Sequence, residues 1–259
     1  MANEHADRSG RWPADTLRAT GIFRSFEGVT ALLDVSLEVA RHEIVGLIGP
    51  NGAGKTTMVN IITGFDLPDS GSVVMEGDDI THWVPHRRGR HGLARTFQGA
   101  HSFSNLTVRE NIEVSALGSG ANAKEARRRA DRLLEMLDLE DMETAPAAVL
   151  PHGHERKLGV ARALGTEPRF VLMDEPAAGL NEMEVEDFAG VIRDVRDEHD
   201  AGVLLIDHNI TLIMGVCNRI HVLEQGRTCA VGTPSEIRGN VDVATAYLGT
   251  SEEASDDGG

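Results

Sequence analysis

The sequence predicts an α/β fold with a mostly parallel sheet at its core, an antiparallel β subdomain and a helical insert. Short apolar runs at residues 43–48, 169–174 and 202–206 alternate with longer, helix-like segments, which is typical of parallel strands joined by helices. Strand-like segments gather toward the N-terminus, and the stretch at about 99–165 is almost purely helical in pattern. No internal repeat of fixed period is visible.

The composition limits the kind of protein. The chain has 259 residues, of which 41% are hydrophobic and 25% charged, as in a soluble globular protein with one large domain or two unequal lobes. The formal net charge of −16 argues against a nucleic-acid partner, because a phosphate backbone attracts basic surfaces. Cys217 and Cys229 lack metal-ligand spacing, so we expect buried free thiols. No apolar run approaches the roughly 20 residues of a membrane span and no hydrophobic leader is visible, which predicts a cytosolic protein.

The N-terminal third is expected to be a tail followed by strands. Residues 1–15 are polar and without periodicity, so we expect them to be disordered. Strands are predicted at residues 17–23, 31–39 and 71–76, the last of them after a Pro-Asp-Ser-Gly turn. Residues 82–92 are basic and rich in histidine, and this composition favours a solvated helix face over a metal site.

The middle of the chain is predicted to be mostly helical. A strand at residues 93–98 precedes a helix at 107–117, which opens with the spacing of a capping box. Residues 124–139 have the periodicity of an amphipathic helix, and a turn and another helix follow at 149–164. The apolar face of the amphipathic helix consists of Ala126, Ala130, Leu133, Leu134 and Leu137.

The C-terminal third returns to alternating elements. After the strand at 169–174, the pattern predicts an acidic helix at 182–200, a strand at 202–206, a helix at 209–216, a hairpin of 219–223 with 227–231, and short helices near 234–238 and 243–248. Residues 251–259 are acidic, and we expect a second disordered tail there, which leaves 16–250 as the folded domain.

A glycine-rich loop is the most informative stretch of the sequence. Residues 49–57 read GPNGAGKTT and match the phosphate-loop pattern G-x-x-x-x-G-K-[ST] between an apolar strand and a helix-like segment. Glycines let backbone N–H groups point at phosphate oxygens, and the N-terminus of the following helix favours the same anion. Lys55 would reach the outer phosphates, and the Thr56 hydroxyl would bind Mg²⁺. The residues expected to bind a nucleoside triphosphate here are Gly49, Asn51, Gly52, Ala53, Gly54, Lys55, Thr56 and Thr57.

Two carboxylates and a histidine are expected at the same sheet edge. Asp174 and Glu175 end an apolar strand, and ligands of parallel sheets bind at the carboxyl ends of the strands. Asp174 could then hold Mg²⁺ through a water, and Glu175 could orient or deprotonate the attacking water. Alone, such a pair is typical of solvated acids. His208 follows another strand and would contact the γ-phosphate or cap the next helix.

An aromatic residue precedes the loop at a distance that suits nucleotide recognition. Phe26 in RSFEGVTAL could stack on a nucleotide base, because aromatic faces pack against planar rings. The residues alone leave open whether Phe26 does so or is a core or turn residue.

Six motifs in order resemble the ATP-binding subunits of ABC transporters, over essentially residues 17–249. They are the phosphate loop, Gln98 in RTFQ as the Q-loop, residues 149–157 as the signature region, FVLMDEP as Walker B, AAGLN at 177–181 as the D-loop, and His208 as the switch histidine. The resemblance implies a P-loop NTPase fold, with ATP and Mg²⁺ as cofactors. It implies that Glu175 is the general base and that Lys55 and His208 stabilise the negative charge of the γ-phosphate. The residues it implies for Mg²⁺ are Thr56, Gln98 and Asp174.

The resemblance also implies two ATPase subunits, identical or different, facing head to tail. ATP on one phosphate loop would be covered by the signature segment of the other subunit, here Pro151, His152, Gly153 and His154. The start of a helix at these residues agrees, because its free amides suit a γ-phosphate. The sequence departs from the family pattern LSGGQ, since Pro151 replaces the serine and His154 the glutamine, and Asn181 stands where aspartate is commoner.

Within the family, TFQ, AAGLN and the ending ATAYLG most resemble the first of the two ATPases of branched-chain amino-acid importers. This implies two membrane permease subunits, an extracytoplasmic solute-binding protein and a position on the inner face of the plasma membrane. ATP binding would close the ATPase dimer and hydrolysis reopen it, with the motion transmitted through the Gln98 loop and the helical insert.

Several other functions remain open. Urea and short-amide importers and lipopolysaccharide exporters use similar cassettes. An ABC ATPase that acts on DNA or ribosomes would be expected to have a coiled-coil insert, tandem cassettes or a basic surface, and the sequence indicates none of these. A non-hydrolytic, ATP-gated binding module is supported only by the altered signature.

Overall fold

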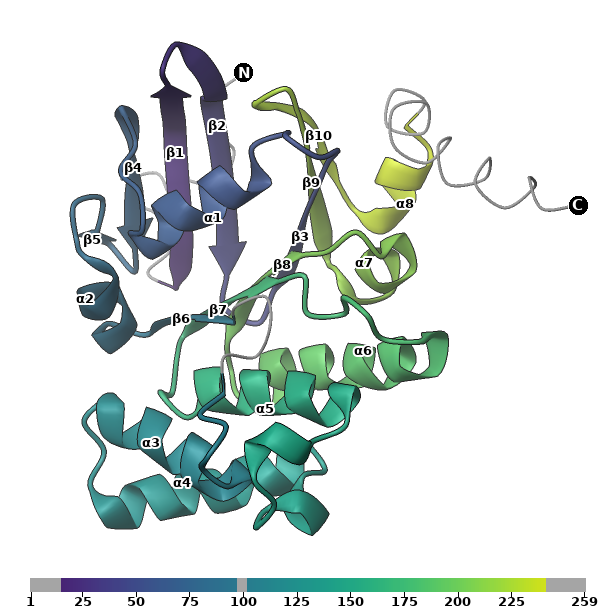
Figure 1. The fold of residues 1–259 in the computed structure, drawn as a ribbon. Helices are drawn as coiled ribbons and strands as arrows, with labels where there is room; N and C mark the ends of the chain where they lie inside the picture. Colours follow the sequence, from purple (N-terminus) through teal and green to yellow (C-terminus); the bar gives the residue numbers. More distant parts are fainter. Residues whose placement is uncertain (1–14, 97–101, 241–259) are drawn as a thin grey trace, which may run out of the picture.

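The structure, a computed structural model, describes residues 15–96 and 102–240 and contains two sheets (Figure 1). One is antiparallel with the strand order β2-β1-β4-β5, and the other has the order β10-β9-β3-β8-β7-β6. Residues 1–14 of the predicted N-terminal tail, the predicted C-terminal tail at 251–259 and the predicted helix near 243–248 lie outside the described residues. The predicted fold class, with a parallel core and an antiparallel subdomain, is confirmed.

The six-stranded sheet places the strand that leads into the phosphate loop and the acidic strand on either side of one shared neighbour. Its strands, in sheet order, are β10 (Arg227–Gly232), β9 (Arg219–Glu224), β3 (Ile44–Ile48), β8 (Gly202–Ile206), β7 (Phe170–Asp174) and β6 (Leu93–Thr96). All neighbouring pairs are parallel except β9 with β10, which form the predicted hairpin. Because these strands are parallel, the loop after β3 and the acids at the end of β7 lie at the same edge of the sheet.

The antiparallel sheet encloses one half of the core. Its strands are β1 (Thr16–Phe26), β2 (Val29–Ala40), β4 (Ser70–Met75) and β5 (Asp78–Asp79), and helix α1 (Lys55–Thr63) lies against it (Figure 1). One buried cluster joins these elements to the side of β3 that carries Val45 and Leu47. The side of β3 that carries Ile44 and Ile48 faces a second cluster, so this strand is buried on both faces.

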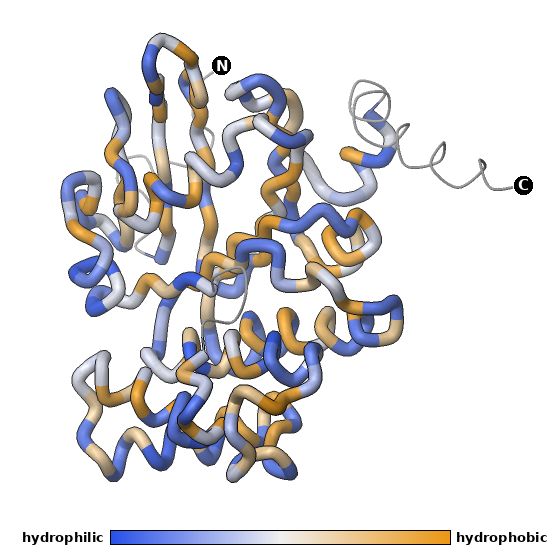
Figure 2. The backbone as a smooth tube through the Cα atoms, viewed as in Figure 1, coloured by the Kyte–Doolittle hydropathy of each residue, from blue (hydrophilic) through white to orange (hydrophobic). Residues whose placement is uncertain are grey.

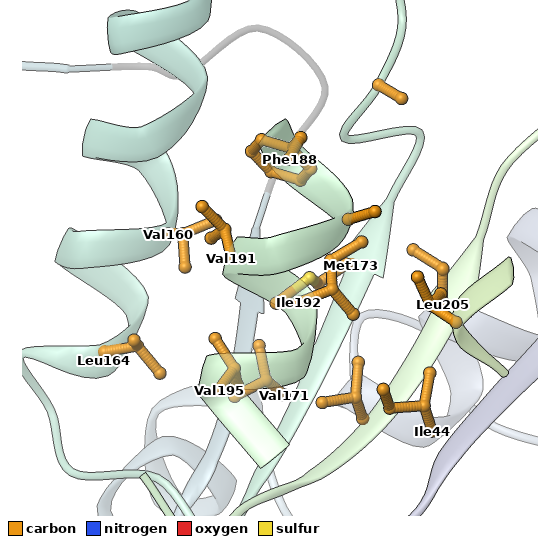
Figure 3. Close-up of a cluster of buried hydrophobic side chains, with 14 of the residues drawn as sticks. Ile44, Val160, Leu164, Val171, Met173, Phe188, Val191, Ile192, Val195 and Leu205 are labelled. Atoms are coloured by element: carbon orange, nitrogen blue, oxygen red, sulfur yellow. The ribbon is translucent and has the colours of Figure 1, made fainter. Parts of the chain in front are cut away.

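Helices cover the opposite face of the parallel sheet. They are α5 (His152–Leu164), α6 (Glu182–Asp197) and α7 (Ile210–Val216), and the short α8 (Pro234–Arg238) follows β10. Figure 3 shows side chains of α5 and α6 gathered over the strand residues Val171, Met173 and Leu205; the helix residues are Val160, Leu164, Phe188, Val191, Ile192 and Val195. Helices α1 and α6 are therefore held on opposite sides of the strands that end at the phosphate loop and at Asp174.

The insert between β6 and β7 extends away from the sheets. It contains α3 (Val108–Gly118), α4 (Ala123–Met136) and two short 3₁₀ turns, Glu140–Met142 and Ala147–Val149, before α5 (Figure 1). The predicted capping box of Thr107 and Glu110 is present. The five residues predicted for the apolar face of α4 are all buried, and Figure 2 shows hydrophilic residues along the outer side of this helix. In the described parts of the chain, no helix has the length and apolar character needed to cross a membrane.

Helix α2 (Pro85–Arg90) has the expected solvated basic face, with His86, Arg87 and Arg90 exposed, and Arg88 is the exception. Arg88 is fully buried, and its guanidinium donates hydrogen bonds to the carbonyls of Ile61 and Ile62 at 2.6 Å and of Thr81 at 2.8 Å. The carbonyls at the end of a helix lack intrahelical partners, so a guanidinium can satisfy them. Burial lowers the pKa of Arg88 to about 10.

The two cysteines differ in their surroundings. Cys217 is buried as predicted, and burial raises the pKa of its thiol to about 12. The prediction is wrong for Cys229, which is exposed on β10, the outermost strand of the parallel sheet.

Candidate functional site

The phosphate loop connects β3 to α1 in a conformation that requires glycine. Gly49 has a φ of 151°, and a Cβ at this position would lie 2.1 Å from the carbonyl oxygen of Leu223. Gly54 has a φ of 105°, and its Cβ would lie 2.6 Å from the carbonyl oxygen of Ala31. Real Cβ atoms are not found so close to backbone atoms, so the neighbouring strands leave room only for glycine at these two positions of the loop.

Lys55 lies at the centre of this loop. Its side chain is buried, and Nζ donates hydrogen bonds to the carbonyl oxygens of Gly49 at 2.6 Å and Pro50 at 3.1 Å. Burial lowers the pKa of Lys55, while the nearby carboxylates of Glu175 and Asp174 act in the opposite direction. The ammonium group is therefore held where the loop curls around it, with two acids close by.

The loop forms one wall of a cavity of about 190 Å³. Its lining residues are Ala31, Asn51, Gly52, Ala53, Gly54, Lys55, Thr56, Thr57, Asp174, Glu175, Ile206 and His208. The structure thus brings together the phosphate loop, the acidic pair at the end of β7 and the histidine after β8. Ala31 and Ile206, which complete the wall, were not among the residues singled out from the sequence.

Glu175 and His208 contact each other across the edge of the sheet. Glu175 has a φ of 49°, a left-handed conformation that is costly for a residue with a side chain, and its N–H donates to the carbonyl of Ile206 at 2.7 Å. His208 Nε2 lies 2.9 Å from Glu175 Oε1. His208 does not cap the following helix, because that role belongs to Asn209, whose side chain accepts from the N–H of Leu212 at 2.9 Å.

Asp207 is a part of this edge that sequence reasoning missed. Its carboxylate accepts hydrogen bonds from the backbone N–H of Ala177 at 3.1 Å and of Asn209 at 2.8 Å. The side chain is buried, and burial raises its pKa. Asp207 therefore ties the loop after Glu175 to the segment that carries His208. Its position at the end of the apolar run VLLID, the same pattern as at Asp174, could have indicated this residue from the sequence.

Asp174 has a partner that the sequence reasoning also missed. Its Oδ2 lies 2.7 Å from Nη2 of Arg95 on the neighbouring strand β6. The carboxylate of Asp174 and the hydroxyl of Thr56 line the same cavity. Both are hard oxygen donors of the kind that Mg²⁺ takes together with phosphate oxygens and waters, so these residues fit the metal.

Two further predicted site residues, Gly49 and Phe26, do not line the cavity. Phe26 is 43% exposed at the end of β1, with the Arg24 guanidinium 4.5 Å from the centre of its ring, so it is not a core residue. Its stacking on a base stays a prediction. Gln98 lies outside the described residues.

The four residues of the signature segment occupy the start of α5. Pro151 is the N-cap, and His152, Gly153 and His154 form the first turn. His152 Nε2 lies 3.1 Å from the carbonyl oxygen of Ala178, which joins this helix to the D-loop of the same chain. None of the four lines the cavity at the phosphate loop.

The comparisons with known proteins agree with the geometry of the site. The family model described as ABC transporter matches residues 32–178. The high-affinity branched-chain amino acid transport ATP-binding protein BraF of Pseudomonas aeruginosa is 38% identical over 248 residues, covering 90% of this chain and 97% of that protein. The lipopolysaccharide export system ATP-binding protein LptB of Escherichia coli is 37% identical over 235 residues, with the same coverage.

The fold comparison agrees as well. The crystal structure of the ADP conformation of MJ1267, an ATP-binding cassette of an ABC transporter, has a TM-score of 0.82 at 27% identity and covers 91% of this chain and 99% of that one. Family model, relatives and structure extend the resemblance of the six motifs to nearly the whole chain. The chain belongs to the ABC transporter family, as one of its ATP-binding cassettes.

Proposed function

We propose that the chain is the ATP-hydrolysing subunit of an ABC importer for branched-chain amino acids. The observation that carries this proposal is the convergence of Lys55, Asp174, Glu175 and His208 on one cavity at the phosphate loop. The name of the relative BraF, which this chain matches over 97% of its length, supports the substrate class.

In this function the chain's own residues bind the triphosphate and activate water. The loop amides and Lys55 bind the phosphates, and Glu175 accepts a proton from the attacking water. His208, whose Nε2 lies 2.9 Å from Glu175 Oε1, would donate a hydrogen bond to the γ-phosphate, so that the Glu175 carboxylate can accept the proton of the water. Bound Mg²⁺, held by Thr56 and Asp174 and, as the resemblance implies, by Gln98, would neutralise phosphate charge.

A second ATPase subunit is part of the proposal. The signature residues 151–154 begin α5 outside the chain's own cavity, so they are available to another subunit's nucleotide. Amide groups at the start of this helix suit a phosphate, and Pro151 at the N-cap costs no hydrogen bond there. Closure of the two subunits around ATP and reopening after hydrolysis would drive transport.

The membrane permease would bind near the helical insert. A groove of about 670 Å³ lies between the α2–β6 segment and helices α3 and α5. Arg90, Arg95 and Arg162 line it, and none of the described residues that line it is acidic. In a chain with a net charge of −16, this groove favours an acidic or polar segment of a permease. The subunit would then sit on the inner face of the plasma membrane, with the solute-binding protein on the other side.

Reconstitution tests this function directly. The purified chain should hydrolyse ATP, and with its permease and binding protein in proteoliposomes it should drive uptake of leucine, isoleucine or valine. ATP-driven uptake of urea or a short amide instead would replace the substrate class. A purified chain that binds ATP and never hydrolyses it, even with the permease, would be a binding module.

Lipopolysaccharide export is the second candidate, because LptB is almost as similar to this chain as BraF. In that case ATP hydrolysis would rise on addition of an exporter complex and its lipopolysaccharide. The importer proposal requires stimulation by the amino-acid-loaded binding protein instead, so one ATPase assay with the two complexes separates the candidates.

A further inference from the structure

Arg95 lies on the strand next to the one that ends in Asp174. In the parallel register Arg95 is opposite Leu172, and Asp174 follows two residues later, so it projects from the same face of β7 as Leu172. The guanidinium Nη2 lies 2.7 Å from Oδ2 of Asp174, and the two side chains are only 11% and 15% exposed. Solvent screens such a pair much less than an exposed one.

The same guanidinium reaches the helix that begins at the phosphate loop. Its Nη1 donates a hydrogen bond of 2.8 Å to Oδ1 of Asn60 on α1. Helix α1 starts with Lys55 and Thr56, so Asn60 lies about one turn further along the same rigid element. Arg95 therefore connects the carboxylate on β7 to the helix that carries the Thr56 hydroxyl.

We propose that Arg95 is a positioning residue for the metal–nucleotide complex, an inference that rests on the proposed ATPase function. Arg95 binds Oδ2 of Asp174, which leaves Oδ1 for the hydration shell of the metal. Through Asn60 it also fixes that carboxylate relative to Thr56. The two oxygen donors of the site are then held in a fixed relative position by one side chain that does not itself line the cavity.

The chemistry of arginine suits this role. Its planar guanidinium presents several N–H donors in a fixed fork and can hold two acceptors at a set angle, whereas a lysine ammonium is a single flexible point charge. A lysine at residue 95 could neutralise Asp174 without fixing it against α1. The sequence signal is a charged residue inside the short strand LART, directly ahead of the RTFQ motif.

The test compares Arg95→Gln with a matched control, Arg18→Gln. Arg18 forms a 2.9 Å ion pair with Glu38, its side chain is 9% exposed, and neither residue lines the cavity. Equilibrium binding of a fluorescent ATP analogue is measured with Mg²⁺ and with EDTA, and ATPase rates are measured against Mg²⁺ concentration. Melting temperatures report any general loss of stability.

We expect the Arg95→Gln chain to bind the analogue within about twofold of wild type in EDTA and about tenfold more weakly with Mg²⁺. The Mg²⁺ concentration for half-maximal hydrolysis should rise by about the same factor. Arg95→Lys should recover part of the loss, and Asn60→Ala, which removes only the link to α1, should shift the Mg²⁺ requirement less and in the same direction. Arg18→Gln should behave as wild type in both buffers.

Two results would overturn the inference. One is an Arg95→Gln chain whose Mg²⁺ dependence matches that of wild type or of Arg18→Gln. The other is an Arg95→Gln chain that loses the same amount of nucleotide affinity with and without Mg²⁺, because Arg95 would then support the phosphate loop itself. If Arg95→Gln does not fold, the Asn60→Ala chain decides: an unchanged Mg²⁺ requirement in that variant would also overturn the inference. A wild-type chain without nucleotide binding contradicts the ATPase function instead, so the two failures are distinguishable.

Discussion

Nε2 of His208 lies 2.9 Å from Oε1 of Glu175, although the two residues follow different strands and are 33 positions apart (208 minus 175). The contact puts a hydrogen-bond donor directly on the carboxylate that would activate water. Glu175 reaches it from a left-handed backbone conformation, with a φ of 49°. The strained turn thus aims the acid at the cavity edge rather than along the strand.

Replacing Glu175 by glutamine should separate binding from hydrolysis. Glutamine keeps the shape of the side chain and its hydrogen-bonding capacity toward His208, but it cannot accept a proton from water. We expect ATP affinity within a few-fold of wild type and hydrolysis reduced about a hundredfold or more, as for loss of a general base. Single-turnover hydrolysis and equilibrium binding on the same sample measure both quantities. Near-normal hydrolysis would remove Glu175 from this role, and Glu186→Gln on the exposed side of α6 serves as the control.

Lys55→Met should weaken nucleotide binding itself. The methionine fills a similar volume in the loop but lacks the ammonium group, which is buried within hydrogen-bonding distance of two loop carbonyls. We expect the ATP dissociation constant to rise about tenfold to a hundredfold, the loss expected for one or two charge-assisted hydrogen bonds. Calorimetric titration measures the change. Lys124→Met, an exposed lysine on α4, should leave the constant unchanged, and equal affinities in the two variants would contradict the role of Lys55.

Much of the fold and site could be predicted because the signals are local. The pattern GPNGAGKTT specifies a loop between a strand and a helix within nine residues, and Asp174 and Glu175 end a strand whose parallel neighbours could be identified by their apolar runs. Parallel strands bring their carboxyl ends together, so adjacency of the two halves followed without knowledge of the strand order.

The missed residues depend on partners that are distant in the sequence. Arg95 meets Asp174 across 79 positions, and Asp207 meets Ala177 across 30. The prediction of a solvated helix face at 82–92 missed the buried Arg88 for a related reason. Arg88 binds carbonyls of α1 that lie 26 and 27 positions earlier, and a periodicity argument about its own helix cannot reveal acceptors on another one.

Arg88→Met should destabilise the whole domain. The guanidinium donates to the carbonyls of Ile61, Ile62 and Thr81, and its removal takes this donor away from all three, although Ile61 also accepts from the N–H of Gly64. We expect a loss of about 2–4 kcal/mol in the free energy of unfolding, part of it offset because a buried charge is also removed. Urea unfolding at neutral pH measures the loss. Arg90→Met, on the exposed side of the same helix, should change stability by less than about 0.5 kcal/mol, and similar losses in both variants would contradict the role of Arg88.

Stability should fall in mildly acidic solution because of His221. Burial, together with the nearby Arg219, lowers the pKa of this histidine to about 4, whereas an unfolded histidine titrates near 6.5. The unfolded chain therefore binds a proton at a higher pH than the folded one, so the stabilising contribution is complete above about pH 6.5 and is lost progressively toward pH 4. Between pH 7 and pH 5 this one group should cost about 1–2 kcal/mol in the free energy of unfolding.

Urea unfolding of wild type and of His221→Gln at both pH values measures this loss. The His221→Gln chain should lose less stability on acidification, while a chain with the exposed His86 replaced by glutamine should lose as much as wild type. Equal losses of stability in all three chains would contradict this prediction. A histidine with a lowered pKa in the folded chain takes up its proton on unfolding, so removing it must reduce the dependence of stability on pH.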